Sequence, residues 1–197
     1  MRTRRVILIS LIVAVIAICA AWAVYKILPH SVNVTLTGIK YKLGSDGAKV
    51  DAEQETVVIR GKLYTTLKGH RTFKGEINIV GEQIPVPPDQ RNLEISFFSE
   101  GFGVMVYPYF YFDQRGATKG SNSYVSHLLF INKDFSQVAF LLNVANEQNS
   151  TNKSEGDFQQ TVNWDSENGY IIAAPASTRE EALALSNKLM RKYQHEE

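Results

Sequence analysis

A run of 20 residues without a charged side chain, residues 6–25, constrains this chain more than any other feature. A helix of that length spans about 30 Å, which is the thickness of the hydrocarbon core of a bilayer. Three arginines lie in the five residues before the run, whereas only Lys26 follows it closely, and this asymmetry predicts a cytoplasmic N-terminus. The sequence therefore predicts a cytoplasmic stub over residues 1–5, an uncleaved transmembrane anchor over residues 6–28, and export of the rest.

Two other interpretations of the same run stay open. A cleaved secretory signal would use the small residues Ala21 and Ala23, but signal cores usually run about 7–15 residues and this one is longer. A lipid-modified Cys19 would need a small residue before it, and Ile18 stands there. All three interpretations place the remaining chain on the outer side of the cell membrane.

The balance of charge excludes several classes of protein. The chain has 21 basic and 20 acidic residues, so composition offers no argument for a nucleic-acid partner. Four of the basic residues and none of the acidic ones lie in residues 1–29, which leaves the predicted exported part with a formal net charge of −3. A single cysteine excludes an internal disulfide framework and a four-thiolate metal site.

Beyond residue 29 the pattern changes to short apolar runs separated by turn signals. This spacing predicts a mainly antiparallel β-sheet, and with the terminal helix described next it predicts an α+β domain over residues 30–197. The predicted strands are residues 32–43, 56–67, 72–80, 93–98, 103–112, 124–131, 135–144, 160–164 and 170–174.

The last segment, residues 178–193, has the features of a capped helix. Thr178 and Glu181 have the spacing of a capping box, in which a hydroxyl and a carboxylate each accept from a free backbone amide. Apolar residues recur at helical spacing on one side. They are Ala182, Leu185, Leu189 and Tyr193. This stripe predicts packing against the domain's own sheet, with docking on another protein as the alternative.

The search for catalytic and metal-binding patterns identifies no site. The four histidines have no partner at ligand spacing, and no nucleophile motif or glycine-rich phosphate loop occurs. The sequence therefore predicts no catalytic residue, no metal and no cofactor. Carboxylates that meet only in three dimensions stay open as a glycan-cleaving pair. The candidates on or beside strands are Glu76, Glu94, Glu100 and Asp113.

Aromatic residues gather in residues 97–112, which hold 8 of the chain's 21. Pro108 lies inside this run and lacks an amide donor, which predicts a strand at a sheet edge or a bulge. On a strand, alternate side chains point to opposite faces. One face would carry Tyr107, Tyr109 and Tyr111, and the other would carry Phe110 and Phe112.

The aromatic run supplies the only predicted binding residues. Tyrosine combines an apolar ring with a hydroxyl, which suits contact with a sugar or a protein. The three tyrosines are therefore the predicted contact face and the two phenylalanines the predicted core face, unless the strand is buried on both. These features predict a non-enzymatic, membrane-tethered binding module of the cell envelope, whose partner is an envelope protein or a cell-wall polymer. A glycan-acting envelope hydrolase with an acidic site is the alternative.

Overall fold

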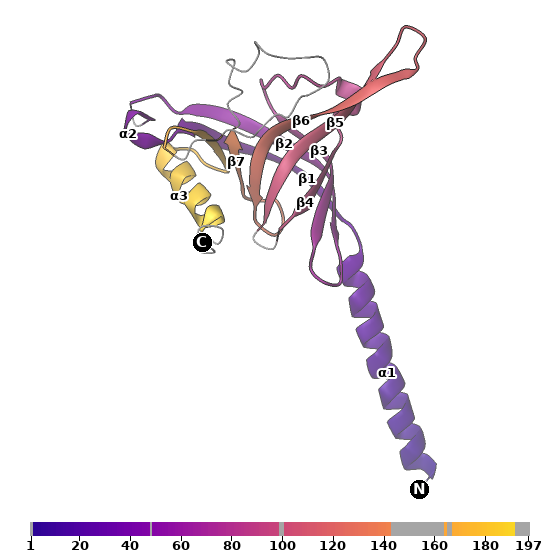
Figure 1. The fold of residues 1–197 in the computed structure, drawn as a ribbon. Helices are drawn as coiled ribbons and strands as arrows, with labels where there is room; N and C mark the ends of the chain where they lie inside the picture. The colour runs from indigo at the N-terminus through magenta and orange to yellow at the C-terminus, as the bar shows by residue number, and fades with distance from the viewer. Residues whose placement is uncertain (1, 48, 99–100, 143–163, 165–166, 192–197) are drawn as a thin grey trace.

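The computed structural model describes residues 2–47, 49–98, 101–142, 164 and 167–191, with residues 2–10 and 46 as backbone only. Within these residues, eight strands form one antiparallel sheet in the order β4-β3-β2-β1-β8-β7-β6-β5 (Figure 1). The strands are β1 (His30–Lys42), β2 (Glu53–Thr65), β3 (Arg71–Ile79), β4 (Leu93–Phe97), β5 (Phe102–Phe112), β6 (Thr118–Ile131), β7 (Val138–Leu142) and β8 (Tyr170–Ala174).

The sheet curls until its two outer strands lie side by side. β4 and β5 stand at opposite ends of the strand order, yet they are consecutive in the chain and pack against each other. Where the chain passes from β4 to β5, the Phe98 amide donates to the Phe102 carbonyl at 2.9 Å. The sheet therefore closes almost into a barrel.

The inner face of the curled sheet holds the larger core. Side chains alternate between faces along each strand, so every second residue enters the interior. Fully buried rings and branched chains fill it, among them Ile59, Phe73, Tyr107, Leu129 and Phe140.

A second apolar layer lies on the outer face, beneath α3 (Arg179–Met190). The helix packs on β8, β1, β7 and β6, and its Leu185 is buried there. The hydroxyls of Tyr41 and Ser186 form a buried hydrogen bond of 2.6 Å between sheet and helix. The helix start is the predicted one: Thr178 Oγ1 accepts from the Glu181 amide, and Glu181 Oε2 accepts from the amide of Ser177. The prediction that the stripe packs on the domain's own sheet is confirmed for its described members.

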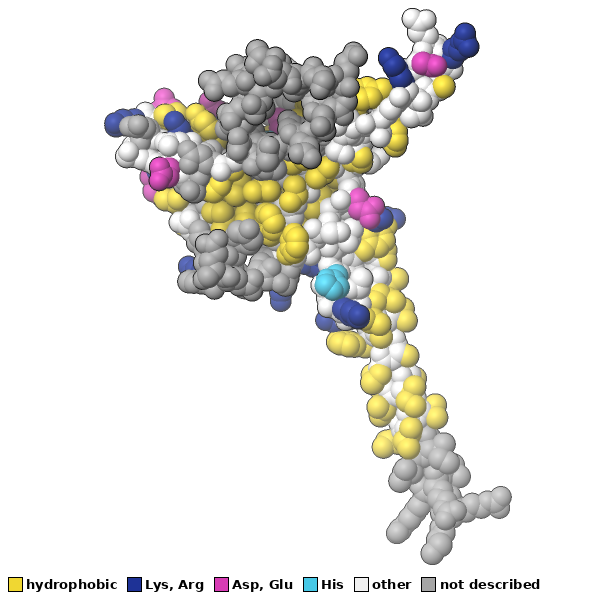
Figure 2. Space-filling model, viewed as in Figure 1, with side chains coloured by type: hydrophobic (Ala, Val, Ile, Leu, Met, Phe, Trp, Pro, Cys, Tyr) yellow, Lys and Arg dark blue, Asp and Glu magenta, His cyan; other side chains and the backbone are white. Residues whose placement is uncertain are grey.

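The helix α1 (Arg2–Ile27) leaves the domain and extends away from it (Figure 1). From Leu11 to Ile27 nearly every side chain is exposed. Apolar side chains lie along the face of this helix that Figure 2 shows. Among the residues that the structure describes, no helix is long and apolar enough to cross a membrane.

The mainly antiparallel sheet with a C-terminal helix is confirmed. The strands β1 to β5 begin and end within three residues of their predicted bounds, and β8 has the predicted bounds. β6 begins at Thr118 rather than at 124, because its first residues are polar and gave no strand pattern. β7 (Val138–Leu142) begins three residues after the predicted start at 135, and the last two predicted residues, 143 and 144, lie outside the described residues. Most of the predicted strand 160–164 lies outside the described residues. Two short helices, α2 (Gly44–Gly47) and η1 (Pro88–Gln90), complete the described elements.

Candidate functional site

The hairpin of β5 and β6 projects beyond the rest of the sheet (Figure 1). We call residues 108–123 of this hairpin the arm. The arm and α1 leave the domain in different directions, so the arm tip lies far from the free end of α1. Burial falls along β5 toward the tip: Tyr107 is fully buried, Tyr109 is half-buried, and Tyr111 is 43% exposed.

The tyrosines lie on the inner face of β5, which corrects the prediction that they form the contact face. Met105 faces the core, and the two-residue period of the strand carries Tyr107 and Tyr109 onto the same side. The Tyr107 hydroxyl donates to the Ile77 carbonyl at 3.5 Å, and burial raises the pKa of this phenol. At the exposed end, the hydroxyls of Tyr111 and Tyr109 lie 3.1 Å apart in a hydrogen bond. Tyr107 is thus a core residue, and only Tyr111 of the three is largely open to a partner.

The phenylalanines are the exposed set, so the prediction that they face the core is wrong. Phe110 is 50% exposed and Phe112 is 56% exposed. Ser121 and Ser123 lie on the same face of the neighbouring strand and are exposed too. Assignment by residue type failed here, because the register inherited from Met105 decides which face is buried.

The free edge of β5 is blocked at the base of the arm. Pro108 has no amide hydrogen, and β5 is the last strand in the order, so its predicted edge position is confirmed. The Gln90 side chain then binds the next outward-facing backbone groups: its Oε1 accepts from the Phe110 amide at 2.7 Å, and its Nε2 donates to the Phe110 carbonyl at 3.4 Å. A partner can therefore contact the exposed face of the arm, whereas strand pairing along the edge of β5 is blocked there.

The arm tip carries more positive than negative charge. Arg115 and Lys119 are exposed there (Figure 2). The one acid, Asp113, turns its Oδ1 toward the loop, where it accepts from the amides of Arg115 and Ala117 at 2.8 and 2.9 Å. Asp113 therefore shapes the turn, which is a structural role for one of the predicted acid candidates.

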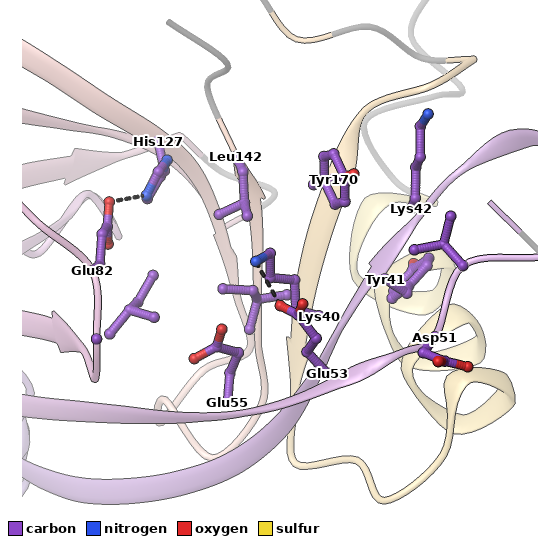
Figure 3. A pocket seen from close by; sticks show the side chains of 14 residues that line it. Lys40, Tyr41, Lys42, Asp51, Glu53, Glu55, Glu82, His127, Leu142 and Tyr170 are labelled. Atoms are coloured by element: carbon purple, nitrogen blue, oxygen red, sulfur yellow. Dashed lines mark hydrogen bonds and ion pairs between the residues drawn. The ribbon is translucent and has the colours of Figure 1, made fainter.

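A cavity of about 470 Å³ opens at one end of the curled sheet (Figure 3). Its floor is apolar and consists of Ile79, Leu142 and Ile172. At this end of the sheet the inward-facing positions are polar, and two residues further along the same strands they are apolar. Glu55 is followed in this way by Val57, and His127 by Leu129. The end of the core is thus converted into a hollow with charged walls.

Two hydrogen-bonded pairs lie in the cavity wall (Figure 3). His127 Nε2 lies 2.6 Å from Glu82 Oε1, and the His127 side chain is almost fully buried. Lys40 Nζ donates to Glu53 Oε2 at 2.8 Å.

The pair of Lys40 and Glu53 is stabilised by charge and by an aromatic ring. The Lys40 ammonium lies 5.8 Å from the centroid of the Tyr170 ring, within cation–π range. The hydrogen bond to Glu53 raises the pKa of Lys40, despite the opposing effect of burial, and the same bond lowers the pKa of the Glu53 carboxyl. The cavity therefore stabilises an ammonium group.

The acid candidates predicted from the sequence lie elsewhere. Glu94 pairs with Lys74 at 2.8 Å on the sheet surface, and Glu76 lies opposite Arg60 on β2 and β3, beside a smaller hollow. Glu100 lies outside the described residues. Within the part of the chain that the structure describes, no group of three His, Cys, Asp or Glu side chains could hold a metal ion.

The cavity was not predicted from the sequence, because its walls come from strands far apart in the chain. A partial signal existed: charged residues stand in or directly before two predicted strands, at positions in phase with their inward-facing residues. Lys40 continues the alternation of Val34 and Leu36, and Glu55 stands two residues before Val57. Nothing in the sequence shows that these positions meet.

Comparison with protein-family models, curated proteins and solved structures finds no match for this chain.

Proposed function

We propose that the chain is a non-enzymatic binding module of the cell envelope, tethered to the membrane by its N-terminal helix and displayed on the extracytoplasmic side. The observation that carries this proposal is the arm, which projects from the domain with two exposed phenylalanines and a basic tip. Exposed aromatic rings are typical of protein and polymer contacts. The partner is an envelope protein or a cell-wall polymer.

The membrane tether is supported by the sequence and by the surroundings of α1. Residues 6–25 carry no charge, and arginines gather before them. Large apolar side chains of α1, including Leu11, Ile16 and Ile18, are exposed, and the helix extends away from the domain (Figure 1). The uncharged run continues over residues 6–10, whose side chains the structure does not describe. An uncharged, mainly apolar run of this length needs an apolar environment, which a bilayer supplies.

The geometry favours binding over the alternative of a glycan-acting hydrolase. Glycoside cleavage needs one carboxyl group with a raised pKa as the general acid. In the cavity, Glu53 is paired with Lys40 and its pKa is lowered, and Glu82 is paired with His127. Release of reducing ends from purified cell-wall glycan, abolished by Glu55→Gln, would favour the hydrolase instead.

The binding proposal is tested with the full chain in lipid nanodiscs, mixed separately with purified cell-wall polymer and with envelope membranes. Phe110→Ser and Phe112→Ser should each weaken association about tenfold or more, as loss of a contact ring at a binding hot spot does. Phe98→Ser is the matched control, because Phe98 is 61% exposed and lies outside the arm. Equal effects of all three substitutions, or no effect of any of them, would contradict a contact surface on the arm.

A further inference from the structure

The cavity at the open end of the sheet has a chemistry that the arm does not share. Its volume of about 470 Å³ falls within the range of about 300–1,000 Å³ usual for small-molecule sites. It also has the composition of such sites, with an apolar floor and a few convergent polar groups (Figure 3). We propose that it binds a small organic cation, an ammonium group carried on an apolar body.

The charges of the side chains that line the cavity indicate the sign of the ligand's charge. Four carboxylates line the cavity (Asp51, Glu53, Glu55 and Glu82), against two ammonium groups (Lys40 and Lys42). Lys40 neutralises Glu53, and Glu82 is hydrogen-bonded to His127. Within the part of the chain that the structure describes, Asp51 and Glu55 have no ion-pair partner. A negative surplus therefore faces the hollow, and an anionic ligand would be repelled.

The position of Lys40 shows how the cavity holds a cation. Its ammonium lies between a carboxylate at 2.8 Å and the Tyr170 ring at 5.8 Å, which is the combination that binds alkylammonium ligands. Glu55 lies close enough to raise the pKa of Lys40 as well. The Lys40 ammonium thus occupies a position that suits an ammonium group, and we call this position, beside Glu53 and the Tyr170 ring, the seat. The apolar floor of Ile79, Leu142 and Ile172 lines the same cavity.

The test uses three probes of one size that differ only in the charge of the head group: benzylammonium, benzyl alcohol and benzoate. The full chain in nanodiscs is titrated at neutral pH, and the methyl NMR signals of Ile79, Leu142 and Ile172 report on the cavity itself. Benzylammonium should bind about tenfold more tightly than benzyl alcohol, and benzoate more weakly than both. Equal binding of all three probes, preference for benzoate, or no shift of these methyl signals would overturn the proposal.

Three substitutions, one of them a control, test the seat. Lys40→Met vacates it and frees Glu53 and the Tyr170 ring, so benzylammonium should bind at least about tenfold more tightly. Lys42→Met is the matched control, because it removes the same charge from the same wall but leaves the Lys40 seat filled. Glu55→Gln should weaken benzylammonium and leave benzyl alcohol unchanged. Equal gains from the two lysine substitutions would contradict the seat, since they would reflect net charge alone.

The same probes separate this proposal from the binding function of the arm. Phe112 lies outside the cavity lining, so Phe112→Ser should leave benzylammonium binding unchanged. Loss of probe binding in Phe112→Ser would contradict an independent site.

Discussion

Tyr107 shows at the scale of a single residue which aromatic rings hold the domain together. Its side chain is fully buried and its hydroxyl is bonded to the Ile77 carbonyl. Tyr107→Ala should therefore lower the free energy of unfolding by roughly 3–5 kcal/mol, the usual cost of deleting a buried ring. Phe110→Ala and Phe112→Ala should each lower it by less than about 1 kcal/mol, because half of each ring already lies in water. Denaturant unfolding of the three variants measures these differences.

Phe98→Ala serves as the control for this series, since Phe98 is also largely exposed. A loss for Phe110→Ala as large as that for Tyr107→Ala would mean that the outer face of the arm is packed in solution.

The aromatic run also marks the limit of prediction at this scale. The two-residue alternation and the edge position of Pro108 could be predicted, because both follow from backbone geometry. The choice of the buried face could not. It depends on whether Met105 or its two neighbours face the core. Both neighbours are valines, so the hydropathy of the sequence does not distinguish the two faces.

At the scale of elements, β2 carries a glycine at a position where it packs closely on β3. Gly61 lies on the inner face, and a methyl group added there would meet the Phe73 ring at 2.8 Å and the Lys74 carbonyl. Gly61→Ala should lower the free energy of unfolding by roughly 1–3 kcal/mol, the cost of overpacking a core. Gly120→Ala is the matched control in β6, where the nearest atom is 3.8 Å away. Equal unfolding midpoints for the two variants would contradict a close contact at Gly61.

The packing of α3 gives a second prediction for an element. Leu185 is buried in the layer between α3 and the sheet. Leu185→Asp should lower the free energy of unfolding by roughly 3 kcal/mol or more, because a charge without a partner enters an apolar layer. Leu67→Asp is the control, since Leu67 is 73% exposed in a loop. A wild-type melting temperature for Leu185→Asp would mean that α3 is detached from the sheet in solution.

Local signals decided which elements could be predicted. The start of α3 follows from Thr178 and Glu181, two residues three positions apart, and most strands follow from their own alternation. The beginning of β6 has no such signal: its first residues are polar, and they pair because the tip turn brings them beside β5. The cavity depends on strands that meet only after the sheet curls, so no local pattern could indicate it.

For the whole molecule, the domain is expected to fold without α1. Both apolar cores are made by residues beyond 29, and α1 contributes no member to them. A fragment of residues 30–197 should therefore unfold cooperatively in water, without added metal, at the melting temperature of the full chain's domain. Circular dichroism of both forms tests this. A fragment that stays unfolded would show that α1 belongs to the fold.

The proposed tether makes a final prediction about the whole chain. The full-length protein should stay in the membrane fraction after alkaline washing, and protease added from the outer side should digest only the domain. Ile16→Arg should shift part of the protein out of that fraction, because an arginine near the centre of a span costs about 2.5–3.5 kcal/mol on insertion. Ile16→Leu is the matched control and should behave like the wild type. A soluble form that begins near Trp22–Val24 would show instead that residues 6–25 are a cleaved signal, and retention of Ile16→Arg at the wild-type level would contradict a span.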